Sequence, residues 1–357
     1  MISRRLLVRA GLALPAIAAV TGGVGRAAQA AATREIVDQN GRRVPLPEKV
    51  TRMVVLQHHS MDVLTQLGAT GQVVGVLRDW RQQLGPGFAR LAPSFATMPA
   101  PGTLTSANVE ELLSLSPDVV ILTYYAPAQM VQAIEAAGMP VVQMAFFRVP
   151  ESERGKLNPV LENEKQAYTD GLIDAIRLLG EITGRQERAA ELVEAALAGR
   201  RLVDERTAAL PEAGRTSMYM ANPDLTTYGS GKYTGVVMEL AGGLNVARGI
   251  QGFGKVTMEQ VLAWNPEAVI VQDRYAAVAD QIRQDPAWTP VRAVAANRVT
   301  VTPEYVKPWG NPVPESLALG EAWMAKALHP ELFADIDLRA RADSFYRRFY
   351  GMPYEGA

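Results

Sequence analysis

Short apolar runs rich in β-branched residues alternate along the chain with stretches in which apolar residues recur at helical spacing. In the first half the apolar runs cover residues 53–57, 73–77, 119–123 and 141–145. Later the alternation begins again, with runs at residues 218–220, 268–271 and 299–301. Short strands that alternate with helices are typical of mostly parallel sheets covered on both faces. The pattern therefore predicts an α/β protein with two lobes of this kind.

A long amphipathic helix is predicted between the two series of strands. Its apolar stripe consists of Tyr168, Leu172, Ile176, Leu179 and Ile182. The stretch corresponds to about five turns of helix and ends before Gly184. We therefore expect an N-terminal α/β lobe at residues 31–163, a connecting helix at residues 164–186 and a C-terminal α/β lobe at residues 187–357.

The first thirty residues have the pattern of an export signal. Charged residues precede an apolar stretch, and Ala28-Gln29-Ala30 is a small-residue cleavage site. The segment Ser3-Arg4-Arg5-Leu6-Leu7 resembles the core of a twin-arginine signal. A membrane-spanning helix is the alternative, but the uncharged residues 10–25 are interrupted by Pro15 and fall short of the roughly 20 residues that a span needs. We expect cleavage after Ala30 and export to a bacterial periplasm.

The composition excludes several classes of protein. Without the four arginines of residues 1–30, 32 basic and 37 acidic residues remain, a net charge of −5, which argues against a nucleic-acid binder. The chain has no cysteine, so it has no disulfide, no thiolate metal site and no lipid-modified cysteine as a membrane anchor. We expect a monomer that is not anchored to the membrane and is stabilised by burial.

One phrase occurs twice and identifies a family resemblance. The two copies are SANVEELLSLSPDVVIL at residues 106–122 and GKVTMEQVLAWNPEAVIV at residues 254–271. Together with IVDQNGRRVPLP, LGATGQVVGV, MELAGGLNVA and HPELFADIDLRARADSFYRRFYG, they resemble the substrate-binding proteins of ABC importers for iron–siderophore complexes, haem and vitamin B12. The resemblance covers essentially the whole mature chain. It implies two Rossmann-like lobes joined by one rigid helix, with ligand bound between the lobes.

The resemblance also implies that an acidic residue on each lobe docks on arginines of the membrane permease, whose ATPase drives import. The matching positions are Glu110 and Glu259. From the residues alone, a glutamate early in a helix is equally explained by the helix dipole, with Asn108 or Thr257 as the cap. Both interpretations remain open.

Candidate ligand-binding residues follow the predicted strands, because ligands bind beyond the carboxyl ends of parallel strands. In the first lobe they are His58, His59, Arg78, Trp80, Tyr124, Tyr125, Phe147 and Arg148. In the second lobe they are Asn222, Tyr228, Lys232, Arg274, Tyr275, Glu304, Tyr305 and Trp309. Aromatic walls and cations suit a bulky anion. We therefore predict capture of a metal chelate, a ferric siderophore first of all, with no intrinsic cofactor.

Other ligands remain open: haem, a corrinoid, an oxyanion such as molybdate, or a bare transition metal held by His58 and His59. Adjacent side chains on a strand point to opposite faces, so both imidazoles converge only at a turn or a helix start. An oxygen ligand such as Glu304 or Tyr305 is then also needed.

An exported hydrolase is the remaining alternative. It would use His58 or His59 as a base and Ser60 or Ser230 as a nucleophile. The sequence has no G-x-S-x-G elbow around a serine. We therefore predict a binding protein and not an enzyme.

Overall fold

The structure, a computed structural model, describes residues 32–211 and 213–356, of which those from Thr33 onward belong to one compact unit. The predicted signal peptide lies outside the described residues. Among the residues that are described, no helix is both long enough and apolar enough to span a membrane.

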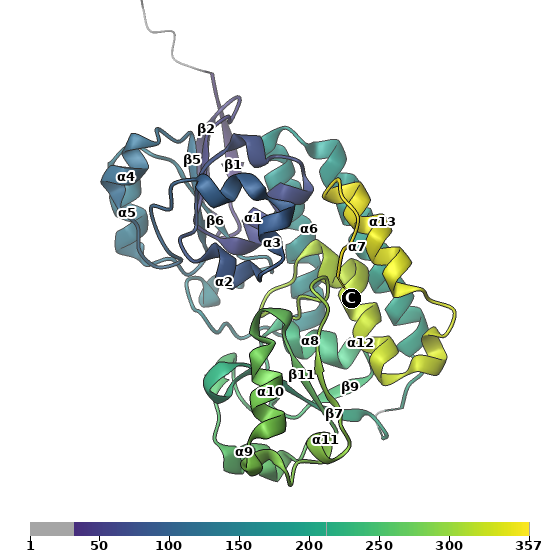
Figure 1. The fold of residues 1–357 in the computed structure, drawn as a ribbon. Helices are drawn as coiled ribbons and strands as arrows, with labels where there is room; N and C mark the ends of the chain where they lie inside the picture. Colours follow the sequence, from purple (N-terminus) through teal and green to yellow (C-terminus); the bar gives the residue numbers. More distant parts are fainter. Residues whose placement is uncertain (1–31, 212, 357) are drawn as a thin grey trace, which may run out of the picture. The chain divides into compact units, whose positions relative to one another are not determined.

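The first lobe, in the upper part of Figure 1, is built on a four-stranded parallel sheet with the strand order β4-β3-β5-β6. The strands are β3 (Met53–Val55), β4 (Val73–Val76), β5 (Val119–Thr123) and β6 (Val141–Met144). Every residue of β3, β5 and β6 is buried, as expected for strands covered on both faces. The helices of this lobe are α1 (His58–Gln66), α2 (Trp80–Leu84), α3 (Phe88–Leu91), α4 (Val109–Ser114) and α5 (Ala128–Ala136).

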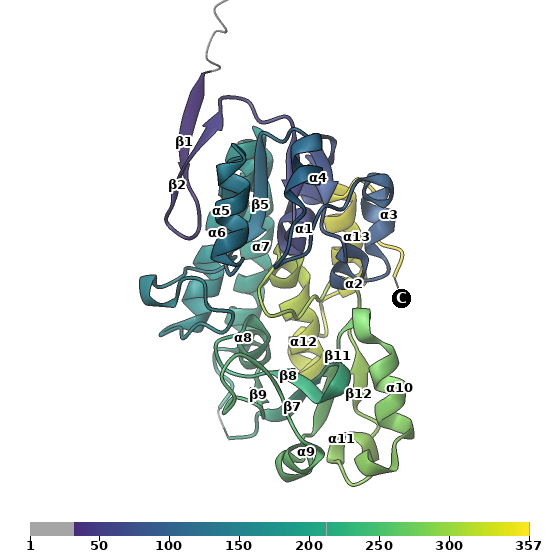
Figure 2. The ribbon, with the colours of Figure 1, turned by 90° about the vertical axis from the view of Figure 1, so that its left-hand side faces the viewer.

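The second lobe repeats the arrangement with the strand order β12-β11-β7-β9, again parallel (Figure 2). The strands are β7 (Thr216–Ala221), β9 (Gly243–Asn245), β11 (Ala268–Val271) and β12 (Val299–Val301). The helices are α8 (Tyr233–Leu240), α9 (Met258–Trp264), α10 (Ala277–Gln284) and α11 (Arg292–Ala295). The predicted α/β class with mostly parallel sheets is confirmed.

Two small antiparallel sheets and several single helical turns complete the secondary structure. In one sheet β1 (Thr33–Val37) and β2 (Arg43–Pro47) form a hairpin, and in the other β8 (Thr226–Tyr228) pairs with β10 (Phe253–Lys255), although α8 and β9 lie between them in the chain. Single turns of 3₁₀-helix lie at Thr70–Gln72, Pro93–Thr97, Glu151–Glu153, Pro223–Leu225, Asp273–Tyr275, Pro286–Trp288 and Pro330–Phe333.

The long helix α6 (Glu164–Thr183) contacts both lobes. Gly171 allows it to approach the first lobe, because a Cβ at this position would lie 2.0 Å from the Cα of Phe147. Near its start, the Tyr168 hydroxyl donates to the carbonyl of Gly231 in the second lobe at 2.8 Å. Gly184, in the left-handed conformation, ends the helix as its C-cap.

The chain after the second sheet contacts both lobes as well. It contains a π-helical turn at Ser316–Gly320, followed by α12 (Glu321–Leu328) and α13 (Leu338–Phe349). This segment packs on α7 (Gln186–Thr207), where Arg200 and Glu321 form a buried ion pair. Just beyond α13, the Tyr350 hydroxyl lies 2.8 Å from a carboxylate oxygen of Asp62 on α1. The C-terminal residues therefore brace the two lobes against each other.

Candidate ligand-binding site

The two adjacent histidines are the first two residues of α1, shortly after β3 ends. The side chain of Gln57 caps this helix, and its Oε1 accepts hydrogen bonds from the backbone N–H and the hydroxyl of Ser60, both at 2.7 Å. Because the pair begins a helix, the imidazoles do not point to opposite faces as they would on a strand. Their ring centroids lie 4.1 Å apart.

Both histidines line a cavity of about 330 Å³ that is formed by residues of both lobes. Nine of its lining residues follow predicted strands and were candidates from the sequence: His58, His59, Tyr124, Tyr125, Tyr228, Lys232, Arg274, Tyr275 and Trp309. The others are Gln83, Leu104, Leu157, Phe253, Gly310 and Asn311. The structure thus brings together side chains that follow β3, β5, β8, β11 and β12.

Two cationic side chains in this cavity have neutral hydrogen-bond partners. The ammonium group of Lys232, which is 5% exposed, donates to the carbonyl of Leu157 at 2.6 Å. Arg274 donates from Nε to Gln272 at 2.8 Å and from Nη1 to the carbonyl of Gln83 at 2.7 Å. Within the described residues, neither forms an ion pair with a carboxylate. Both charges are therefore available to an anionic ligand.

Burial keeps both histidines neutral near pH 7. It lowers the pKa of His59 to about 3, with a further contribution from the positive charge of Arg274. Burial also holds the pKa of His58 well below its usual value, with contributions from His59 and Arg274. A neutral imidazole has one N–H donor and one acceptor nitrogen. The pair can therefore offer an anion hydrogen bonds but no full charge.

Several buried polar atoms of the cavity have no hydrogen-bond partner among the described residues. They are His58 Nδ1, His59 Nε2, Trp309 Nε1 and Asn311 Oδ1. A buried polar group without a partner costs about 1–3 kcal/mol. The start of α1 adds the backbone N–H groups of His58 and His59, which have no acceptor within the helix. Asn311 Oδ1 can only accept, but the ring nitrogens, the indole N–H and the backbone N–H groups supply donors at a helix N-terminus, which suits an anion.

The cavity is not arranged as a site for a bare metal ion. No group of three or more His, Asp or Glu side chains is placed to hold a metal in the part of the chain that the structure describes. Glu304 instead accepts a hydrogen bond from Arg90 at 2.9 Å, and the ring of Tyr305 packs on Tyr354 with centroids 5.2 Å apart. The oxygen ligand expected beside the histidines is therefore not supplied by these two residues.

Several other sequence candidates lie outside the cavity because other contacts take up their side chains. Trp80 is buried against Phe88 and Phe95, with centroid distances of 6.3 Å and 6.1 Å. Arg78 is exposed, and its Nε lies 3.4 Å from the carbonyl of Ala100. These residues follow β4, whose continuation turns into the aromatic core of the first lobe.

The residues that follow β6 also lie outside the cavity, because other contacts take up their side chains. Phe147 packs edge-on against Tyr124 with centroids 4.9 Å apart, under the cavity wall. Arg148 pairs with Asp170 at 2.7 Å and with Asp174 at 3.1 Å on α6. In the second lobe, Asn222 accepts a hydrogen bond from Gln272 at 2.7 Å and lines a separate groove.

The sequence reasoning missed six lining residues. Gly310 and Asn311 directly follow the candidate Trp309, so extending that segment by two positions would have found them. Leu157 belongs to an irregular segment, and Phe253 begins the short strand β10, which the sequence pattern did not predict. Gln83 and Leu104 likewise enter only through tertiary packing.

The two candidate docking glutamates occupy equivalent, exposed positions in the first turns of α4 and α9. Asn108 caps α4 and accepts from the backbone N–H groups of Glu110 and Glu111, both at 3.1 Å. Thr257 caps α9 in a capping box with Gln260. Both caps are thus made by other side chains, and the carboxylates of Glu110 and Glu259 are not needed for them.

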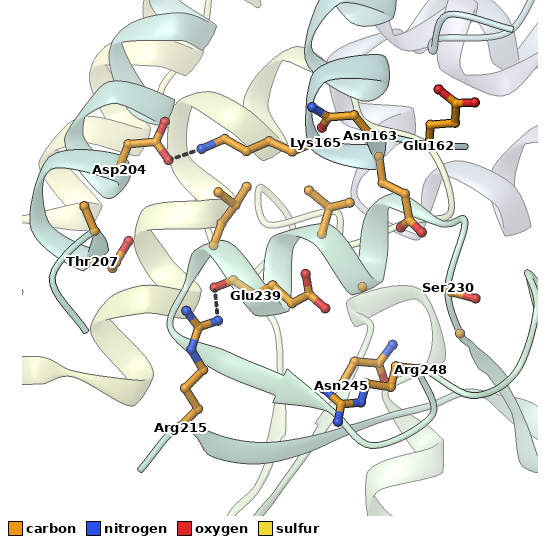
Figure 3. Close-up of a pocket in the computed structure, with 16 residues that line it drawn as sticks. Glu162, Asn163, Lys165, Asp204, Thr207, Arg215, Ser230, Glu239, Asn245 and Arg248 are labelled. Atoms are coloured by element: carbon orange, nitrogen blue, oxygen red, sulfur yellow. Dashed lines mark hydrogen bonds and ion pairs between the residues drawn. The ribbon is translucent and has the colours of Figure 1, made fainter. Parts of the chain in front are cut away.

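A larger cavity of about 720 Å³ lies where α6 begins, next to the end of α7 and to α8 (Figure 3). Its acidic side chains are those of Glu162, Glu164, Asp204 and Glu239, and its basic ones are those of Lys165, Arg215 and Arg248. Lys165 is paired with Asp204 at 2.7 Å. Because carboxylates outnumber the cations here, this cavity is a poorer site for an anion than the one between the lobes.

The chain matches the family described as periplasmic binding proteins over residues 53–306. It is 47% identical over 327 residues to the molybdate-binding protein MolA of Haemophilus influenzae, covering 91% of this chain and 93% of MolA. The solved structure of MolA bound to molybdate has a TM-score of 0.90 to this chain and covers 91% of it and 100% of the MolA chain.

More distant structures share the fold. A periplasmic solute-binding protein of Veillonella parvula is 24% identical with a TM-score of 0.74, covering 90% of this chain and 94% of its own. The periplasmic binding protein FepB of the same organism is 20% identical with a TM-score of 0.66, covering 90% and 97%. The predicted two-lobed class is confirmed, and because the relatives are binding proteins, so is the prediction that this chain is not an enzyme.

Proposed function

The chain belongs to the periplasmic binding protein family and serves an ABC importer, and on that premise we propose that it captures a small tetrahedral oxyanion, molybdate or a close analogue, between its lobes. The observation that carries the proposal is a pair of cations, the buried Lys232 and the half-buried Arg274, whose hydrogen-bond partners are neutral. A dianion would neutralise both.

The donors around these cations suit the oxygens of such an anion. Trp309 offers an indole N–H, the neutral histidines offer one ring N–H each, and α1 offers backbone N–H groups at its start. A fully deprotonated oxyanion such as molybdate accepts hydrogen bonds on every oxygen and donates none. A site rich in donors and poor in carboxylates is therefore selective for it.

The cavity size favours the oxyanion over our first expectation of a ferric siderophore. Pockets for drug-sized ligands span about 300–1,000 Å³, and the 330 Å³ found here lies at the lower end of that range. Siderophore complexes, haem and corrinoids are larger than drug-sized molecules. Together with the 47% identity to a molybdate-binding protein, this supports the oxyanion, which was one of the alternatives.

Delivery to the permease is proposed to use Glu110 and Glu259. Both carboxylates are exposed and lie at equivalent helix starts in the two lobes. Two acidic contacts, one on each lobe, would orient the ligand-loaded protein on basic side chains of the permease.

Isothermal titration with molybdate, tungstate, sulfate, phosphate, a ferric siderophore, haem and cobalamin tests the proposal. We expect binding of molybdate and tungstate and none of the three large ligands. Arg274→Gln should weaken molybdate binding, whereas the control Arg248→Gln, in the cavity of Figure 3, should not. Binding of a large chelate in place of molybdate would contradict the proposal.

A further inference from the structure

One wall of the ligand cavity is an irregular segment, residues 156–160, which we call the strap. It lies between the 3₁₀ turn at Glu151–Glu153 and the start of α6. Its residue Leu157 lines the cavity although its side chain is 50% exposed. Leu157 therefore forms part of the cavity wall and is also open to solvent.

The strap is bonded to both lobes across the cavity. From the first lobe, the Tyr124 hydroxyl donates to the carbonyl of Leu157 at 3.0 Å. From the second lobe, Lys232 donates to the same carbonyl at 2.6 Å, and Gln251 donates to the carbonyl of Pro159 at 3.0 Å. The side chain of Asn158 accepts from the backbone N–H of Phe253 at 3.1 Å.

The second lobe has two glycines where the strap crosses it. A Cβ at Gly252 would lie 2.2 Å from Cγ of Asn158, and a Cβ at Gly231 would lie 2.8 Å from the carbonyl oxygen of Pro159. Both glycines also have positive φ, +73° and +76°, which other residues adopt at a cost. Because both positions are glycine, the second lobe leaves room for the strap to pack closely against it.

The strap also holds its own shape. The carboxylate of Glu153 accepts from the backbone N–H of Val160 at 2.9 Å and pairs with Lys156 at 2.8 Å. These two contacts hold the segment between Glu153 and Val160 in its turn, and neither involves the second lobe. A preformed wall limits the volume of the cavity more strictly than a flexible loop would.

We propose that the strap is the specificity-determining element of this site: it closes one side of the space between the lobes and so restricts the ligand to a small oxyanion. This inference rests on the proposed function. The backbone carbonyl of Leu157 in the strap also accepts a hydrogen bond from the ammonium group of Lys232. Because this carbonyl is neutral, the cavity wall keeps the positive charge of Lys232. Loosening the strap should admit larger anions and weaken the grip on small ones.

The test is the double variant Asn158→Ala/Gln251→Ala, which removes side-chain bonds of the strap and leaves Leu157, Lys232 and Arg274 unchanged. Titrations with molybdate and with the anionic ferric tris(catecholate) complex are compared. We expect molybdate affinity to fall about tenfold, from the loss of these hydrogen bonds, and the ferric complex to bind the variant but not the wild-type protein. The matched control is Gln166→Ala/Gln186→Ala, on exposed positions at the starts of α6 and α7.

Thermal melting verifies that each variant is folded. If the double variant does not fold, the single variants Asn158→Ala and Gln251→Ala carry the test, with a smaller shift in the same direction. Folded variants with the wild-type preference for molybdate over the ferric complex contradict the strap's role alone. Wild-type protein that fails to bind molybdate contradicts the proposed function, and the size limit with it.

Discussion

His58 and His59 combine two properties at the scale of single residues: they are buried, and they are adjacent to the positive charge of Arg274. Both properties disfavour the imidazolium, so the pKa of His59 is lowered to about 3 and that of His58 lies well below its usual value. Their pairing at a helix start is therefore compatible with donating hydrogen bonds to an anion from the neutral rings, and not with carrying a positive charge.

The lowered pKa values make the free energy of unfolding fall in acid. An imidazole in an unfolded chain has a pKa of about 6.5, so the unfolded state binds more protons than the folded state between that value and the lowered one. The contribution of His59 is therefore complete above about pH 6.5 and is lost as the pH falls towards about 3. Between about pH 6.5 and about pH 5 the loss amounts to about 2 kcal/mol.

We therefore expect His59→Gln to lose less free energy of unfolding than wild type when the pH is lowered from about 7 to about 5. Urea unfolding at both pH values measures this. His329→Gln, at the end of α12, is the matched control. An equal loss in wild type and His59→Gln would show that His59 is not held neutral. Comparing variants cancels the opposite effect of Asp62 and Asp273, whose pKa values are both raised to about 7, chiefly by burial.

Lys232 predicts how ligand affinity depends on pH. Burial lowers its pKa to about 8, so its positive charge is present at neutral pH and is lost as the pH rises through about 8. We expect molybdate affinity to fall over that range. Lys232→Met should lower the affinity at pH 7 about ten- to a hundredfold, the worth of one hydrogen bond to a charged group.

The same substitution should also flatten the pH profile between about pH 7 and about pH 9, measured by titration calorimetry. The control is Lys165→Met, which removes a lysine paired with Asp204 in the other cavity. If Lys232→Met bound molybdate as well as the control does, the ammonium group would have no part in recognition.

At the scale of elements, α1 joins the ligand cavity to a buried ionic cluster. His58 and His59 lie at its start, and Asp62 lies one turn further on. Asp62 pairs with Lys307 at 3.0 Å, and Lys307 also pairs with Glu315. All three side chains are buried, and the Tyr350 hydroxyl contacts both carboxylates. The cluster thus connects α1, the segment after β12 and the end of α13.

Removing the ammonium group of Lys307 from this cluster should lower the free energy of unfolding. Lys307→Met would leave Asp62 and Glu315 buried together without a counter-charge, and breaking such an arrangement costs about 3–5 kcal/mol. Chemical denaturation should show this loss, whereas Lys255→Met, on an exposed position of β10, should change the free energy of unfolding by less than about 0.5 kcal/mol.

A further substitution tests the cause. Lys307→Met/Glu315→Leu removes one of the stranded carboxylates and should recover part of the lost stability. If Lys307→Met is as stable as wild type, or if the double variant is less stable than the single one, the cluster does not contribute through its charge.

At the scale of the whole molecule, α6, the C-terminal segment and the strap all connect the two lobes. Several rigid connections resist large hinge motions. A permease that binds both lobes would then meet exposed side chains at a nearly constant distance from each other. Glu110 and Glu259, at equivalent helix starts, are suited to such a two-point contact.

We expect Glu110→Lys and Glu259→Lys each to reduce stimulation of the permease's ATPase in reconstituted vesicles, and the double variant to abolish it. Molybdate affinity should not change, because neither residue lines the cavity. Glu187→Lys, exposed at the start of α7, is the control. Undiminished stimulation by the double variant would remove these glutamates from the docking surface.

The local pattern was sufficient for much of this structure. Apolar runs predicted β3, β5, β6 and β11 because strands covered on both faces must be apolar throughout. The stripe headed by Tyr168 predicted a connecting helix at residues 164–186, and α6 covers residues 164–183 of it, because a helix of that length buries a regular face. The rule that ligands lie beyond strand ends likewise selected His58, Lys232 and Arg274.

What the sequence determined by itself was therefore the α/β class, the two lobes, the family and the strand ends around which the site is built. Only the tertiary structure decided which of those residues face the cavity. Trp80 was drawn into an aromatic core and Arg148 into ion pairs with α6, while Leu157 entered from an irregular segment. The physical reason is that periodicity reports on neighbours along the chain. Cavity size, uncompensated charge and the strap depend on contacts between residues far apart in sequence.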